Sequence, residues 1–128
     1  MWFVLIIAVV VLVLVAWVAL RMRRGRRLSP GSAQRYRSTF EVLKRLPDAH
    51  RRVLEAEKVV DSAMFELGVQ GNFADKLKKA GPRFRDVQSL WNAHKLRNRI
   101  AHEMNLAVPE GEMQRAVAAF EKALEQLS

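Results

Sequence analysis

The sequence predicts an all-α protein in which one membrane-spanning helix precedes a small bundle of four to five helices. Residues 1–20 are uninterrupted apolar sequence, and apolar residues recur every three or four positions through most of the rest. No segment alternates in the way a half-buried strand does. We therefore expect a transmembrane helix at 1–20, a basic juxtamembrane linker at 21–32 and a helical bundle at 33–128.

The composition limits the chemistry. The chain has 128 residues and no cysteine, which excludes disulfides and thiolate metal sites and fits a reducing compartment. Its net charge is +9, but five of the 22 Lys and Arg residues lie in 21–27, which leaves 17 basic against 13 acidic residues in the remainder. The bundle is thus moderately basic, a balance that permits contact with RNA or an anionic membrane without requiring either.

The apolar start fits a retained anchor. Twenty helical residues at a rise of about 1.5 Å span about 30 Å, the thickness of a bilayer's hydrocarbon core. Trp2 and Trp17 stand near the two ends, where indole rings favour the interface. A cleaved signal peptide would begin with positive charge and carry a shorter apolar run, whereas here the charge follows the run.

A cluster of arginines follows the anchor and predicts its orientation. The cluster consists of Arg21, Arg23, Arg24, Arg26 and Arg27. Because basic flanks stay on the cytoplasmic side, we expect the N-terminus outside and the bundle in the cytoplasm, at the inner (cell) membrane. The same arginines could also hold anionic lipid headgroups, although a topology signal is enough to account for them.

Periodicity and helix-end signals place the bundle's helices. The expected helices cover residues 33–46, 49–67, 73–80, 84 or 86 to 104, and 110 onward. Pro47 and Gly68 end the first two, and Asp48 and Asn72 are good N-caps for the second and third. The side chains expected to face the core are Tyr36, Phe40, Leu43, Val53, Val60, Met64, Leu67, Phe73, Leu77, Leu90, Ala93, Leu96, Ile100, Met104, Met113, Val117, Phe120, Leu124 and Leu127.

Polar residues able to do chemistry gather on the fourth expected helix. His94, Asn98 and His102 are four residues apart and share one stripe. Arg97 and His102 are five apart, about 140° around the axis at about 100° per residue. They can share a site only if Arg97 reaches around, if the helix deforms, or if two copies of the helix face each other.

The segment Arg97-Asn98-x-x-x-His102 resembles the R-x4-6-H motif of the HEPN superfamily, whose members often carry a polar residue directly after the Arg. HEPN domains are small all-α bundles, usually dimeric, and many place the motif on a long helix late in the bundle. The resemblance covers the bundle in helix order, but only this segment is specific. Arg45 and His50 have the same spacing, but Pro47 lies between them and Leu46 follows the Arg.

The resemblance implies metal-independent RNA cleavage, in which the ribose 2′-hydroxyl attacks the adjacent phosphate. His102 would then be the general acid or base, Arg97 would hold phosphate charge, and Asn98 would bind phosphate or fix the imidazole, with two copies pooling these groups. Many HEPN domains are instead binding or scaffold modules. In that reading the three residues form a polar network or a dimer contact, and Arg97 pairs with Glu103 or with a carboxylate on another helix.

The remaining candidates are weaker. A run of basic residues precedes the fourth helix and comprises Lys76, Lys78, Lys79, Arg83 and Arg85. It is either a solvated face or, if RNA binds, the surface that meets its phosphates. We interpret His94 as a residue on the helix face and not a catalytic one. We interpret Trp91 as an anchor in the core or an interface rather than a base-stacking platform. Two His residues with no carboxylate on their stripe make a poor metal site, and no Gly-rich phosphate loop occurs, so we expect no cofactor.

Overall fold

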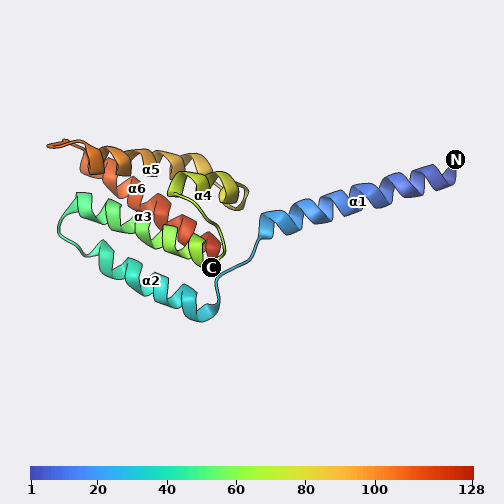
Figure 1. Cartoon of the computed structure of the whole chain (residues 1–128), viewed down its shortest axis with the longest axis horizontal. Coiled ribbons are helices and arrows are strands. Elements are labelled where there is room, and N and C mark those ends of the chain that lie inside the picture. The colour runs from blue at the N-terminus through green and yellow to red at the C-terminus, as the bar shows by residue number, and fades with distance from the viewer.

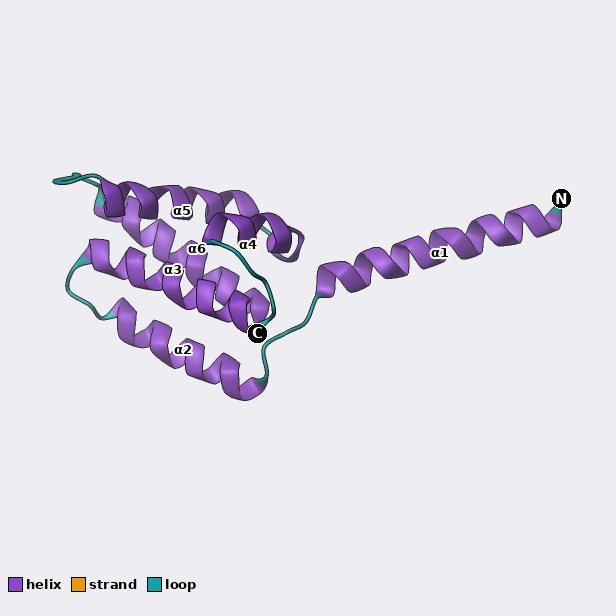
Figure 2. Ribbon diagram, in the orientation of Figure 1, coloured by secondary structure: helices purple, strands orange, loops and turns teal.

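The computed structural model describes the backbone of residues 1–128 and the side chains of residues 1–21 and 25–128, and every regular element in it is helical (Figure 2). The elements are α1 (Trp2–Arg24), α2 (Pro30–Lys44), α3 (Ala49–Glu66), α4 (Phe73–Ala80), the 3-10 turn η1 (Gly81–Arg83), α5 (Val87–His102) and α6 (Glu110–Leu127). The predicted all-α class with an N-terminal apolar helix is confirmed.

Helix α1 stands apart from the bundle (Figure 1). Its segment Trp2–Arg21 has a mean hydropathy of 3.4, and none of it is buried against the rest of the chain. By length and composition it can cross a membrane. The helix continues past the apolar run to Arg24 because no helix-breaking residue precedes Gly25, which has a φ of 42°. The side chains of Arg23 and Arg24 lie outside the described residues.

The other helices form one bundle around α3 and α6. These two pack together in the same direction, with α5 against α6, α2 against α3, and the short α4 beside α5 (Figure 1). The C-terminal ends of α3 and α6 lie at the end of the bundle that faces α1, together with η1 and the N-terminal ends of α2 and α5. We call this the near end. The loops 45–48 and 103–109 lie at the opposite, far end.

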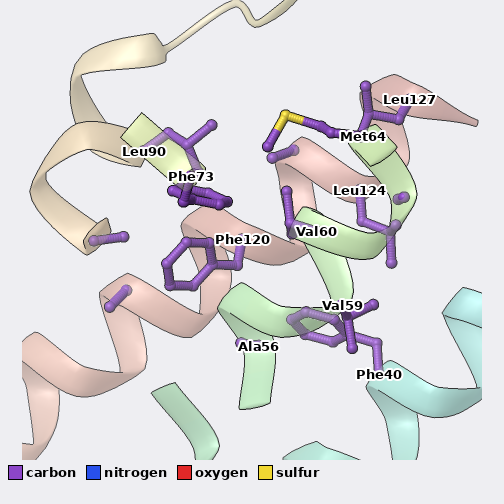
Figure 3. Close-up of a cluster of buried hydrophobic side chains, with 14 of the residues drawn as sticks. Phe40, Ala56, Val59, Val60, Met64, Phe73, Leu90, Phe120, Leu124 and Leu127 are labelled. Atoms are coloured by element: carbon purple, nitrogen blue, oxygen red, sulfur yellow. The ribbon is translucent and has the colours of Figure 1, made fainter. Parts of the chain in front are cut away.

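Large apolar side chains fill the space between these helices (Figure 3). Phe120 of α6 is fully buried and meets Phe73 of α4 edge to face, with ring centroids 5.9 Å apart. Burying a side chain of this size stabilises the fold by about 2–3 kcal/mol. Met104 is an exception, since it is 92% exposed: α5 ends at His102, two residues before the expected end, and Asn105 takes a φ of 58°.

Helix ends follow local chemistry. Asp48 and Asn72 cap α3 and α4 as predicted, each accepting a hydrogen bond from a backbone N–H of the first turn. Helix α2 begins at Pro30 rather than 33, because the Ser29 hydroxyl accepts from the N–H of Ser32 and proline is favoured in a first helical turn. The bundle begins even earlier, at Leu28, which is buried.

Candidate functional site

A buried carboxylate lies at the centre of the polar residues of α5. Glu57 of α3 is only 6% exposed, and its two oxygens face α5. Oε2 lies 2.8 Å from Nδ1 of His94, and Oε1 lies 3.4 Å from Nε of Arg97. The carboxylate therefore joins the middle of α3 to the polar stripe of α5.

Glu57 is buried because of its position in α3. It lies four residues after Val53 and three before Val60, both fully buried, so it falls within the apolar stripe that faces the core. Burial raises the pKa of its carboxyl above the ordinary range, and the hydrogen bond with His94 opposes that rise. The neighbours on α5 thus offset a charge that would otherwise be costly in this place.

The hydrogen-bond network assigns a tautomer to His94. Nδ2 of Asn98 lies 3.3 Å from Nε2 of His94; the amide can only donate, so Nε2 accepts and the imidazole proton is on Nδ1, where it is donated to Glu57. Phe73 and Trp91 flank the imidazole at centroid distances of 5.0 and 6.1 Å. The ring is therefore fixed from four sides.

Arg97 is held by the same network. Its Nη1 donates to Oδ1 of Asn98 at 3.4 Å, and its Nε, although 3.4 Å from Glu57, is buried and not aligned for a hydrogen bond with any described residue. The interaction with Glu57 is thus an ion pair without the two parallel bonds of an ideal arginine–carboxylate pair. The guanidinium is thus paired within the protein while 29% of its side chain stays exposed.

These groups open onto a cavity of about 450 Å³ between α3, α4 and α5. Glu57, His94, Arg97 and Asn98 line it on one side, and Asp61 and Lys58 line it as well. Two acidic and two basic side chains nearly balance, so the cavity has no strong preference for an anion. Both ring nitrogens of His94 are already hydrogen-bonded, so the Asn98 amide, with its second N–H and its second lone pair, is what the cavity can offer to a small polar ligand.

His102 lies outside this constellation. It is the last residue of α5, it is exposed, and it makes no hydrogen bond or ion pair with any described residue, nor does it line the cavity. The structure thus brings Arg97 and Asn98 together with His94 and Glu57. Of the alternatives left open by the sequence, Arg97 pairs with a carboxylate on another helix rather than with Glu103.

The basic run before α5 divides into two groups. Lys76 is 3% exposed, and its ammonium lies 2.8 Å from Asp61, so it is not available to RNA and leaves the predicted contact surface. Arg83 donates to the backbone carbonyl of Arg26, and burial lowers the pKa of its guanidinium. The other three, Lys78, Lys79 and Arg85, are exposed.

No family model, curated protein or solved structure matches the chain. The described side chains also hold no cluster of three or more His, Asp or Glu placed to bind a metal ion. Of the groups at the site, sequence reasoning missed Glu57, whose signal was an acidic residue within the buried stripe of α3.

Proposed function

We propose that this protein is a single-pass membrane protein whose HEPN-like bundle faces the cytoplasm and serves as a non-catalytic interaction module. The pairing of Arg97 with Glu57 carries the proposal. A phosphate-binding cation must be free to meet its substrate, whereas this one compensates a buried carboxylate. Withdrawing it would leave the buried carboxylate with His94 alone, and removing one partner of a buried ion pair destabilises the fold.

The membrane anchoring is supported by α1 and the arginines that follow it. The apolar segment is long enough to span a bilayer, and the basic cluster lies on the bundle side of it. The positive-inside rule then orients the N-terminus outward at the cell (inner) membrane. A tag placed before Met1 should react with a membrane-impermeant reagent on intact cells; protection of that tag would contradict this orientation.

The HEPN-like assignment is supported by the placement of the motif. Arg97, Asn98 and His102 lie on α5, a long helix late in a bundle of helices joined by short loops. The assignment rests on these three residues and on helix order.

A groove between α5 and α6 supports an interaction role. It measures about 520 Å³ and has buried Ala93, Leu96 and Ala116 among its lining residues. Lys95 and Arg115 also line it and are exposed. An apolar floor with basic edges fits an acidic segment of a partner protein.

A second candidate function is a dimeric, metal-independent endoribonuclease that uses Arg97, Asn98 and His102 from two copies. The surroundings of His102 favour it. His102 is exposed and unpaired among the described residues, and Met104, two residues on, exposes 92% of its surface. An exposed apolar side chain beside an exposed imidazole fits a contact with a second copy of the chain. Such a contact would bring together Arg97, Asn98 and His102 from the two α5 helices.

One experiment distinguishes the two functions. The full chain in lipid nanodiscs is mixed with labelled RNAs of varied sequence in EDTA, and the wild type is compared with His102→Ala and with Gln88→Ala, a control substitution of an exposed α5 residue outside the groove and the cavity. We expect no cleavage by any of the three. Cleavage that His102→Ala abolishes and Gln88→Ala preserves would refute the module and establish the nuclease.

A further inference from the structure

Very little chain separates α1 from the bundle. Helix α1 ends at Arg24, and Leu28 is already part of the core, where it is buried and donates its N–H to the carbonyl of Leu127 at 2.8 Å. The three residues between, 25–27, can span only about 10 Å. If α1 crosses a membrane, Leu28 and the near end of the bundle are therefore held within about 20 Å of the hydrocarbon boundary, which is within or just beyond the headgroup layer.

The turn η1 closes this gap further. Arg83 donates to the carbonyl of Arg26 and lies against Gly25, where a Cβ would approach its Nε to 2.8 Å. The contact places η1 on the linker, at the end of the bundle that faces α1 (Figure 1). Residues on either side of η1 are thereby brought to the same level as the juxtamembrane arginines.

These residues are strongly basic and largely unpaired. The side chains of Lys78 and Arg85 are exposed and form no ion pair with any described residue. The nearby carboxylates of Asp75 and Asp86 accept hydrogen bonds at the starts of α4 and α5 and keep their negative charge. They are outnumbered by five exposed cations, Arg26, Arg27, Lys78, Lys79 and Arg85, so this part of the near end carries a net positive charge.

We propose that Lys78, Lys79 and Arg85 form, together with Arg26 and Arg27, a surface that docks the near end of the bundle on anionic lipid headgroups. This docking surface rests on the proposed membrane anchoring and goes beyond it, because it assigns bundle residues and an orientation. The far end, with the end of α5, then points away from the bilayer.

The short tether favours lipid over RNA as the occupant. Because α1 fixes the docking surface beside the headgroups, lipid contact is intramolecular and has a high effective concentration. The field of an anionic leaflet acts within a Debye length of about 8–10 Å, a distance comparable to that spanned by residues 25–27. RNA would have to enter between this surface and a bilayer of its own sign.

The absence of cysteine makes the test direct, since a single introduced thiol can carry a fluorophore. Pro82→Cys places the probe on exposed η1, Gln70→Cys gives a second reading at the near end, and Ala107→Cys reports from the far end. The full chain is reconstituted in nanodiscs of phosphatidylcholine alone or with 30% phosphatidylglycerol. Quenching by acrylamide, which is uncharged, measures how far lipid shields each probe.

We expect anionic lipid to reduce quenching at position 82 at least twofold and at position 70 in the same direction, with no change at 107. Lys78→Gln/Arg85→Gln should abolish this protection, as should 0.5 M salt. Arg45→Gln/Arg51→Gln, which removes the same charge from exposed residues at the far end, should preserve it.

Three outcomes would overturn the proposal. Equal quenching in neutral and anionic discs would exclude docking, and equal loss in both double variants would exclude this surface. Protection of position 82 by added RNA in neutral discs, removed by Lys78→Gln/Arg85→Gln and with no lipid effect, would assign the surface to RNA. Failure of the chain to co-elute with discs is separately visible and would overturn the membrane anchoring itself.

Discussion

Replacing Glu57 and His94 singly and together tests whether the buried pair joins α3 to α5. Oε2 and Nδ1 are 2.8 Å apart, and the two side chains are 8% and 12% exposed. We predict that Glu57→Ala and His94→Ala each lower the free energy of unfolding by about 2–3 kcal/mol, because a charge-assisted hydrogen bond contributes about 1.5–3 kcal/mol. The double variant should lose less than the sum, with a coupling of at least about 1 kcal/mol.

The chain offers its own reporter for this cycle. Of its three tryptophans, only Trp91 lies in the bundle, 6.1 Å from the His94 ring. In a Trp2→Phe/Trp17→Phe background, urea unfolding in nanodiscs can be followed by Trp91 fluorescence and by circular dichroism. Midpoints from both probes should coincide, which checks that unfolding is two-state.

A matched cycle on an exposed pair gives the comparison. Glu55 and Lys58, three residues apart on α3, lie 3.2 Å apart and are 35% and 65% exposed. Their coupling should be below about 0.5 kcal/mol, since solvent screens such pairs. If the Glu57–His94 coupling is equally small, this hydrogen bond does not join the two helices.

Three further predictions follow from the same geometry. The folded chain holds the Glu57 proton more tightly than the unfolded one, so Glu57's contribution to stability should fall as pH rises from about 4.5 through its raised pKa. Wild type should therefore lose stability relative to Glu57→Gln, which does not titrate, over that range, as measured by urea unfolding at each pH. Lys76→Met should cost under about 1 kcal/mol because Asp61 is 41% exposed and can be solvated, whereas Asp61→Ala strands a buried ammonium and should cost about 3 kcal/mol; equal losses would contradict the asymmetry. Gly25 has a φ of 42°, and a Cβ there would approach the Arg83 side chain, so Gly25→Ala should weaken the contact between η1 and the linker and speed tryptic cleavage of the linker. Gly31→Ala, whose Cβ meets no atom within 4 Å, should not change the cleavage rate.

The elements that local chemistry determines could be predicted from the sequence. The bounds of α4 follow from the Asn72 cap and the Gly81–Pro82 break, and Phe120 and Met64 are buried where their spacing placed them. Such signals lie within a few residues of one another, so no knowledge of packing is needed. The end of α5 was less predictable. The apolar spacing of a helix continues through Ile100 to Met104, but the helical backbone ends at His102.

The candidate site depends on contacts between distant segments. Glu57 and His94 are 37 residues apart, and their pairing requires the register of α3 against α5, which no local pattern supplies. The burial of Lys76 was closer to prediction. It follows Phe73 by three positions and lies on the same buried face of α4 as Leu77. Because it also belongs to a run of basic residues, the sequence alone assigns it to an exposed surface.

The hydrogen bond from Leu28 to Leu127 has a practical meaning for anyone who attaches a reporter to this protein. It brings the entry and the exit of the bundle side by side, so a fluorescent protein fused directly after Ser128 would start next to the anchor and crowd the bilayer. An insertion in the loop 103–109 would instead project from the opposite tip. Imaging and capture experiments therefore need a long spacer at the C-terminus or an internal tag in that loop.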